Sequence, residues 1–422
     1  MINKAKNAQA QIKKFFSSLI LAILFSISFV QPAAGDEVDV TFGETKVENF
    51  FPDGFRFSVK IVVQHYKGRI DFYYRLGEDE WVSYPADCLQ KEKDNVEYYS
   101  CVYYLNYEVL PPQLPVSYKW RLSSPVDKYS TEKTVIYENS DFEWNSLHED
   151  KLTIWWHDHP SEFTNQILSA ATTALQKEEE FYGVKLEHPI QIVILNSEDE
   201  LYAWRERAKQ SIGGEAFPNL GTTIQIFEED MQGDYLEGWV NEVIPHEISH
   251  LYFAQAVGSG QTSIPRWLDE GLAGYSEFSD HSEDWGFVRQ AIQQNTLIPL
   301  NQLRVDFPEG DEKVSLSYAE GTTAVIYIVE KYGQDGLNKL FSAYQAGKSS
   351  DEAFTQAFGR NLEDFEKDWQ TWVVSQQKGS TNTVKILFGI IFLSTACSFI
   401  LLVTIIVVIA IFNKKIKIQP VQ

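Results

Sequence analysis

Hydrophobic and polar residues alternate in short runs between residues 38 and 139, and these runs are rich in Val, Tyr, Phe and Trp. Turn-forming stretches such as Pro52-Asp53-Gly54 and Pro111-Pro112 separate the runs. Short alternating strands at nearly regular spacing are typical of an antiparallel β-sandwich. The pattern predicts strands at Phe55–Val63, Ile70–Leu76, Glu97–Tyr104, Val116–Leu122 and Lys133–Tyr137.

After Asp141 the hydrophobic period lengthens from two residues to three or four. Phe163, Ile167, Ala171 and Leu175 recur at the spacing of an amphipathic helix. We expect strands at Lys151–Trp156, Ile190–Leu195 and Thr222–Phe227, and helices at Ser161–Tyr182, Leu236–Val257, Pro265–Phe278, Glu283–Gln294, Ser317–Tyr332, Gly336–Ala346 and Leu362–Ser375. The fold class expected is therefore multidomain, with an immunoglobulin/fibronectin-like sandwich over residues 36–140 and an α+β domain over residues 141–378.

The first 35 residues have the composition of a secretory signal peptide. Four lysines precede an apolar run from Phe15 to Val30, and the small residues Ala33-Ala34-Gly35 follow it. An uncleaved membrane anchor is the alternative, but the apolar run is short for a bilayer that needs about 20 residues. We expect cleavage after this segment and export of the chain.

A second apolar segment, 386–412, lies near the C-terminus and contains no charged residue. It is long enough to span a bilayer with some tilt, and it lacks the polar face of a buried amphipathic helix. Lys414, Lys415 and Lys417 follow it, which predicts a cytoplasmic tail over residues 413–422 and an extracytoplasmic location for the rest of the chain.

Composition excludes several kinds of partner and site. The 59 acidic residues outnumber the 36 basic ones, and a net charge of −23 would repel a phosphate backbone, so nucleic acid is not expected as a partner. Three cysteines are too few for a Cys-based metal cluster, so a metal site must use His and carboxylates. In an oxidising compartment Cys88 and Cys101 are candidates for one disulfide.

The segment Val243-Ile244-Pro245-His246-Glu247-Ile248-Ser249-His250 contains an HExxH motif. Two histidines four residues apart on one helix face can bind the same metal ion, while Glu247 can reach a metal-bound water without being a ligand. Pro245 is expected to kink or start this helix. Twenty residues after His250, Trp-Leu-Asp-Glu-Gly contains Glu270, a third ligand of the type used by catalytic zinc sites.

In these motifs, and over roughly Asp141–Ser375, the sequence resembles the gluzincin metallopeptidases, and especially the peptidase MA-like domains. The resemblance implies a zinc ion held by His246, His250 and Glu270, with Glu247 as the catalytic base. The sequence is also similar to the zinc aminopeptidases around the third ligand. It lacks their Gly-Ala-Met-Glu-Asn stretch, so aminopeptidase specificity does not follow from the resemblance.

Other residues could stabilise the oxyanion, orient a ligand or align the substrate. Family members place a tyrosine near the start of the helix that begins near Tyr318, so Tyr318 is the first candidate for stabilising the oxyanion and His281 is the second. Glu277 either orients a histidine ligand or is a surface carboxylate. The strand Gly221–Phe227 resembles the edge strand along which such peptidases align a peptide, with an interior strand as the alternative.

Two other polar clusters are not expected to carry chemistry. His157-Asp158-His159 has no further ligand nearby in the sequence, and Glu178-Glu179-Glu180 is expected to be a solvated helix face. The sequence as a whole predicts a membrane-anchored, extracytoplasmic zinc metallopeptidase that acts on a peptide or protein substrate. The alternatives are a cell-surface binding protein with a vestigial or structural zinc site, and a zinc hydrolase of non-peptide amides or esters.

Overall fold

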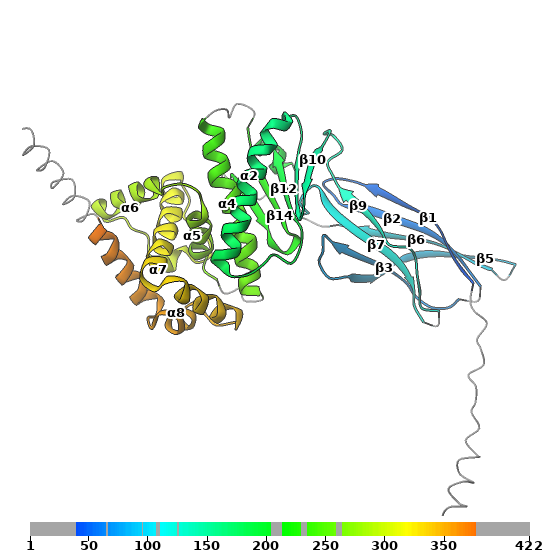
Figure 1. Cartoon of the computed structure of the whole chain (residues 1–422). Helices are drawn as coiled ribbons and strands as arrows, with labels where there is room; N and C mark the ends of the chain where they lie inside the picture. The colour runs from blue at the N-terminus through cyan, green and yellow to red at the C-terminus, as the bar shows by residue number, and fades with distance from the viewer. Residues whose placement is uncertain are drawn as a thin grey trace, which may run out of the picture. The chain divides into compact units, whose positions relative to one another are not determined.

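The computed structural model describes residues 39–376, apart from residues 65, 95, 107–109, 125, 204–212, 229–233 and 259–263. The predicted signal peptide and the predicted membrane helix 386–412 lie outside these residues. Within the described part of the chain, no helix combines the length and the apolar character needed to cross a bilayer. The described part of the chain divides into two compact units, of which the first contains residues 39–75, 81–106 and 117–134, and the second contains residues 76–80, 110–116 and 135–376, with the gaps given above (Figure 1).

The N-terminal region consists of two β-sheets, as the alternating pattern predicts. The first sheet has the order β1 (Val40–Asn49), β2 (Phe55–Val63), β6 (Val96–Leu105) and β5 (Asp87–Lys93). The second has the order β4 (Val82–Pro85), β3 (Ile70–Leu76), β7 (Leu114–Leu122) and β8 (Lys128–Tyr129), and β9 (Lys133–Tyr137) also pairs with β7.

Aromatic side chains from the two sheets pack against each other. The ring centre of Phe72 on β3 lies 4.7 Å from that of Phe57 on β2 and 4.6 Å from that of Tyr103 on β6. Cys88 and Cys101 are cross-strand partners on β5 and β6 and form a disulfide, which confirms the predicted pairing.

A five-stranded sheet organises the region that follows, with the order β10 (Asn145–Glu149), β11 (Leu152–Trp156), β12 (Ile190–Leu195), β14 (Thr222–Ile226) and β13 (Gly214–Phe217). The central strands β11, β12 and β14 are parallel, and the outer two are antiparallel to their neighbours. The prediction that residues 221–227 form an edge strand is therefore wrong. β14 is interior and fully buried, and the edge belongs to the four-residue strand β13, which is too short to show an alternating pattern.

Helices cover one face of this sheet and continue into a helical region (Figure 1). Side chains of α2 (Ser161–Tyr182) and α4 (Asp234–Val257) share a core with alternate residues of β11 and β12. The remaining helical elements are α3 (Glu198–Tyr202), η1 (Pro218–Leu220), α5 (Arg266–Ser276), α6 (Ser282–Gln294), η3 (Leu300–Leu303), α7 (Asp311–Gln345), α8 (Ser350–Phe358) and a last helix over residues 362–376.

The two helices predicted at Ser317–Tyr332 and Gly336–Ala346 are both present and share the label α7, because a kink at the non-helical Gly333 separates them; the first starts earlier than predicted, at Asp311. One expectation for the helices needs correction. Glu178 is not solvated: only 3% of it is exposed. It lies four residues after the buried Ala174 on α2, so the helical period turns it toward the core while Glu180 stays exposed.

Glu320 on α7 is a fully buried carboxyl group. Its Oε1 accepts a hydrogen bond from the Ile298 amide at 2.8 Å, and its Oε2 has no hydrogen-bond partner among the described residues. Burial raises the pKa of Glu320 from 4.5 to about 8. Between these two values the unfolded chain has released the proton and the folded chain has kept it, so this group makes stability fall as pH rises.

We expect Glu320→Gln, which keeps the acceptor for the Ile298 amide but cannot ionise, to remove this loss of stability at high pH. At about pH 9 the variant should unfold at a higher urea concentration than the wild type, and at about pH 5 the two should unfold at similar concentrations. The difference between their free energies of unfolding should grow by up to about 1.4 kcal/mol per pH unit. Glu330→Gln, at an exposed position on the same helix, is the matched control. An equal difference at both pH values would contradict the buried-carboxyl explanation.

Candidate metal centre

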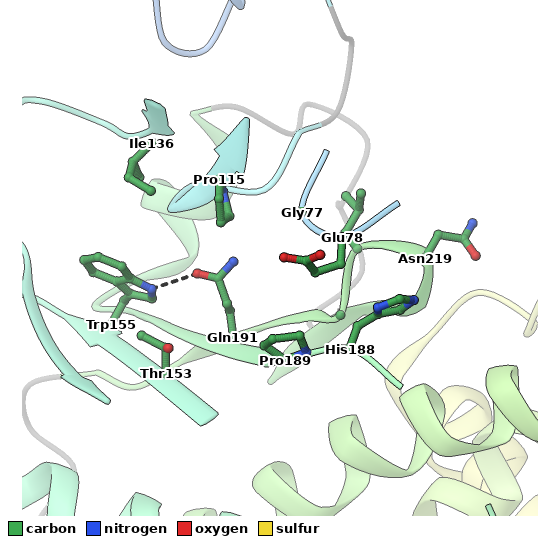
Figure 2. Close-up of a pocket in the computed structure, with 12 residues that line it drawn as sticks. Gly77, Glu78, Pro115, Ile136, Thr153, Trp155, His188, Pro189, Gln191 and Asn219 are labelled. Atoms are coloured by element: carbon green, nitrogen blue, oxygen red, sulfur yellow. Dashed lines mark hydrogen bonds between the residues drawn. The ribbon is translucent and has the colours of Figure 1, made fainter. Parts of the chain in front are cut away.

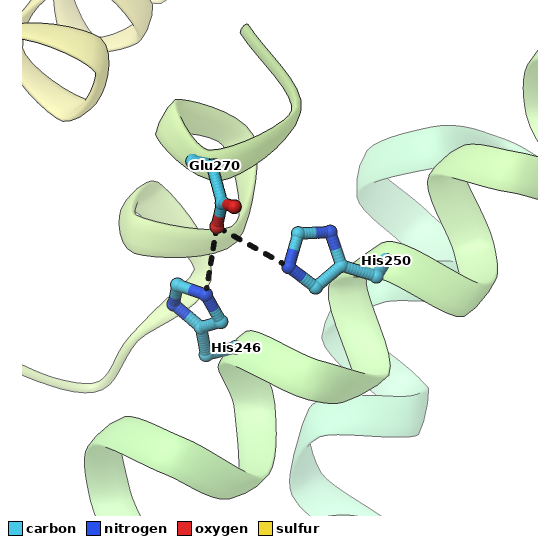
Figure 3. Close-up of side chains that lie close together, drawn as sticks. All are labelled: His246, His250 and Glu270. Atoms are coloured by element: carbon cyan, nitrogen blue, oxygen red, sulfur yellow. Dashed lines mark ion pairs between the residues drawn. The ribbon is translucent and has the colours of Figure 1, made fainter. Parts of the chain in front are cut away.

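The HExxH motif lies in the middle of α4, so His246 and His250 are one turn apart on the same face (Figure 3). Pro245 lies inside this helix and does not start it. Because proline has no N–H, the carbonyl of Asn241 lacks its usual donor within the helix. It accepts instead from the amide of Phe278, at 2.8 Å, just after α5. The proline thus makes available a carbonyl that joins the end of α5 to α4.

Glu270 on α5 completes a group of three converging side chains. Its Oε2 lies 3.5 Å from Nε2 of His246 and 3.7 Å from Nε2 of His250 (Figure 3). One ligand atom from each residue lies within 4.8 Å of the others. No second group of three or more His, Cys, Asp or Glu residues in the described part of the chain converges in this way. These three side chains can therefore hold a metal ion.

Carboxylates hold the other ring nitrogen of each histidine. Nδ1 of His246 lies 2.9 Å from Oε1 of Glu277, and Nδ1 of His250 lies 2.8 Å from Oδ1 of Asp269. An imidazole that donates its Nδ1–H to a carboxylate presents a free lone pair on Nε2, as a metal ligand must. The orienting role considered for Glu277 agrees with this contact. Asp269 was missed, and its place directly before Glu270 was the only indication in the sequence.

The carboxylates of the site favour positive charge on the groups that they surround. Burial by itself lowers the pKa of His246, but hydrogen bonds to Glu270 and Glu277 outweigh it and raise that pKa well above its usual range. Asp269 and Glu270 likewise outweigh burial and raise the pKa of His250 to about 9. Burial opposes ionisation of Glu270, yet the two histidines and Arg266 lower its pKa to about 2. The cluster therefore favours a cation at its centre.

Glu247 is buried beside the cluster and is not part of it. Only 5% of the residue is exposed, and its Oε2 has no hydrogen-bond partner among the described residues. Burial raises the pKa of Glu247 to about 6, although the neighbouring imidazoles act to lower it. Gly214 of the edge strand β13 lies directly against it: a Cβ at this glycine would be 2.6 Å from Oε1 of Glu247. The edge strand therefore borders the general base that the motif predicts.

Tyr318 on α7 lies in the wall of the same site. Its ring centre is 6.4 Å from that of His246, and the ring packs edge-on against Phe307. Burial and the nearby Glu270 raise the pKa of Tyr318, so the hydroxyl stays protonated at neutral pH. Arg266 was not singled out from the sequence. Its Nε lies 3.2 Å from Oε1 of Glu270, and its side chain also hydrogen-bonds to Tyr318.

One family model matches the part of the chain that forms this site. Residues 170–375, which include both motifs, match the model of the peptidase MA superfamily. This chain contains a peptidase MA superfamily metallopeptidase domain. The chain is also similar to the crystal structure of an aminopeptidase N family protein from Idiomarina loihiensis, with 10% identity and a TM-score of 0.36 over 78% of this chain and 76% of that chain. No curated protein matches the chain in sequence.

Two other histidines of the metallopeptidase lie in different surroundings. His281, the second candidate for the oxyanion, pairs with Asp284 at 3.4 Å and stacks on Tyr275. Nδ1 of His157 lies 2.8 Å from Oδ2 of Asp158, and its Nε2 lies 3.2 Å from Oε2 of Glu200. Both ring nitrogens of His157 thus contact carboxylate groups.

A pocket of about 200 Å³ lies on the sheet face opposite the helices, within the second unit (Figure 2). Thr153 and Trp155 of β11 line it, while the alternate residue Ile154 faces the helical core. The indole of Trp155 donates to Oε1 of Gln191 at 2.9 Å. None of the metal-site residues lines this pocket, so it is separate from the active site.

The contact between Asp269 and His250 predicts a loss of metal affinity in Asp269→Asn. An amide holds the Nδ1–H less strongly than a carboxylate does, and such changes typically cost about 10–100-fold in affinity. Zinc titration against a chromophoric chelator measures the change, with Glu283→Gln at an exposed position on α6 as control. Equal affinities for wild type and Asp269→Asn would show that the contact does not support the metal site.

The close approach of Gly214 predicts a selective loss of activity in Gly214→Ala. The added methyl group must displace the Glu247 carboxylate, and a shift of about 1 Å at a reacting group can cost on the order of 100-fold in rate. Metal affinity should stay unchanged because no ligand moves. Gly213→Ala is the matched control, since its Cβ would meet Val243 at an ordinary 3.4 Å. Equal hydrolysis of denatured casein by the two variants would contradict the prediction.

Proposed function

We propose that this chain is a membrane-anchored, extracytoplasmic zinc peptidase that hydrolyses peptide bonds. In this proposal His246, His250 and Glu270 hold the zinc ion, Glu247 is the general base, and Tyr318 stabilises the oxyanion. One observation carries the proposal: the buried carboxylate of Glu247, whose Oε2 has no hydrogen-bond partner among the described residues, lies beside three converging ligand atoms.

The donor set fits zinc. Two imidazole nitrogens and one carboxylate oxygen are the ligands of many catalytic zinc sites. Tetrahedral ligand atoms at about 2.0–2.1 Å from zinc would lie roughly 3.3–3.4 Å apart. The observed separations of 3.5 Å and 3.7 Å between the Nε2 atoms and Oε2 of Glu270 are close to this value. Both Nδ1 atoms are held by carboxylates, so the Nε2 lone pairs remain for the ion.

The surrounding side chains have the protonation states that hydrolysis needs. Zinc, when bound, supplies Lewis-acid chemistry that polarises a carbonyl group and acidifies water. A pKa of about 6 leaves Glu247 ionised at neutral pH, so its carboxylate can take a proton from the attacking water and pass it to the leaving amine. The protonated hydroxyl of Tyr318 can donate a hydrogen bond to the oxyanion that forms.

The proposed location and domain limits rest on separate observations. The Cys88–Cys101 disulfide supports an oxidising compartment. Two facing β-sheets support an immunoglobulin/fibronectin-like sandwich. The proposed organisation is a signal peptide (1–35), the sandwich (36–140), a gluzincin-type domain (141–378), a transmembrane helix (386–412) and a cytoplasmic tail (413–422).

Glu247→Gln tests the proposal directly. The variant should bind zinc as the wild type does, because Glu247 is not a ligand, and it should lose at least about 100-fold in peptide hydrolysis, because the general base is gone. Mass-spectrometric identification of peptides cleaved from a proteome digest measures hydrolysis and also reports the cleavage preference. Glu237→Gln, at an exposed position on α4, is the control.

Two results would contradict the proposal. Unchanged hydrolysis by Glu247→Gln would show that another group is the base. Zinc binding by the wild type without cleavage of any peptide in a broad library would show that the site does not hydrolyse peptides.

A further inference from the structure

A buried polar network joins α2, α4 and α5 next to the metal centre. It contains Glu178 and Tyr182 on α2, Ser249 on α4 and Ser276 on α5, and none of these residues is more than 9% exposed. The Tyr182 hydroxyl lies 2.8 Å from that of Ser249, which lies 3.1 Å from that of Ser276. Oε2 of Glu178 lies 3.1 Å from the Ser276 hydroxyl.

The network reaches the metal centre through the chain itself. Ser249 directly precedes the ligand His250, and Ser276 directly precedes Glu277, whose carboxylate holds the ligand His246. The separation between the imidazoles on α4 and Glu270 on α5 depends on how these two helices are placed. The contact between Ser249 and Ser276 is one of the contacts that fix this placement.

The contacts of the Ser276 hydroxyl favour a protonated Glu178. The Ser276 hydroxyl lies within hydrogen-bond distance of three oxygens, namely Glu178 Oε2, Ser249 Oγ and, at 3.0 Å, the carbonyl of Leu272. It has one hydrogen and two lone pairs, and the carbonyl can only accept. All three contacts are satisfied together when Ser276 donates to Leu272 and accepts from both Ser249 and a protonated Glu178.

The groups that face Glu178 do not compensate a negative charge. They are the phenols of Tyr182 on α2, Tyr252 on α4 and Tyr275 on α5, together with the network hydroxyls. Lys177 on α2 is the one cation that acts on Glu178 among the described residues, and its ammonium group lies over the ring of Phe278, 4.0 Å from the centroid. Burial therefore dominates and raises the pKa of Glu178 to about 8.

We propose that Glu178 is a positioning residue of the metal centre, whose neutral carboxyl group donates to Ser276 and so fixes α5 on α4. The inference rests on the proposed zinc site. It explains why a carboxyl group occupies a core position where an apolar residue would avoid the cost of burial. When Glu178 loses its proton it can only accept, so the Ser276 hydrogen turns from Leu272 to Glu178. The buried negative charge, on which Lys177 is the one cation that acts among the described residues, then destabilises the packing of α5.

Three variants of the full-length chain test this role. Glu178→Gln keeps a neutral donor to Ser276, Glu178→Leu removes the donor, and Glu180→Gln changes an exposed carboxylate on the same helix. Zinc affinity is measured by chelator competition at about pH 7 and about pH 9, with circular dichroism as a check on folding. Titration of the histidine ligands changes the zinc affinity of all variants alike, so the ratio of zinc affinities between wild type and variant isolates the effect of Glu178.

At about pH 7 we expect wild type, Glu178→Gln and Glu180→Gln to bind zinc equally, and Glu178→Leu to bind about tenfold more weakly. At about pH 9 the wild type should bind about tenfold more weakly than Glu178→Gln, because only the wild type has lost the neutral donor. The infrared difference spectrum of the wild type minus Glu178→Gln at neutral pH should contain the C=O band of a neutral carboxylic acid, because the band of Glu320 is common to both proteins and cancels.

Several results would overturn the inference. One is a folded Glu178→Leu that binds zinc as tightly as the wild type. Another is a ratio of zinc affinities between wild type and Glu178→Gln that is the same at both pH values. The third is a difference spectrum without the neutral-acid band. If Glu178→Leu does not fold, the zinc affinities of wild type and Glu178→Gln at the two pH values and the infrared band still test the inference. Failure of the zinc site itself would appear differently, because the wild type would then bind no zinc at either pH.

Discussion

The metal centre depends on the fixed placement of α5 on α4. Both histidines belong to α4 and the third ligand belongs to α5, so neither helix can offer three ligands alone. The Asn241 carbonyl and the Phe278 amide join the two helices, as do the hydroxyls of Ser249 and Ser276. The first contact satisfies a carbonyl that Pro245 leaves without its helical donor, and the second joins two buried hydroxyl groups. The same contacts that stabilise the fold therefore set the ligand separations.

The carboxyl groups of this domain fall into two kinds. Around the imidazoles, Glu270 is held in its ionised form and the ring nitrogens are bound by further carboxylates, so this part of the protein needs a cation. Glu178 and Glu320 lie in the core without such compensation, and their raised pKa values keep them neutral near pH 7. The overall negative charge of the chain does not distinguish these kinds; burial and the immediate neighbours do.

Much of the architecture could be predicted because the signals are local. The bounds of β2, β3 and α2 follow from hydrophobic alternation or helical period, and the three ligands follow from motif spacing. The residues that were missed depend on tertiary contacts. β13 is four residues long, Asp269 is defined by the histidine it touches, and Arg266 by its contacts to Glu270 and Tyr318. Glu178 was misplaced because a run of three glutamates hides the position that faces the core.

The central claim is that one zinc ion is held by His246, His250 and Glu270. X-ray absorption at the zinc edge, measured on the full-length wild type and on Glu270→Ala, tests it most directly. The account predicts a wild-type shell with two imidazole nitrogens and carboxylate oxygen at about 2.0–2.2 Å, and the loss of bound zinc in the variant. A wild type without stoichiometric zinc, or an unchanged ligand shell in Glu270→Ala, would contradict it.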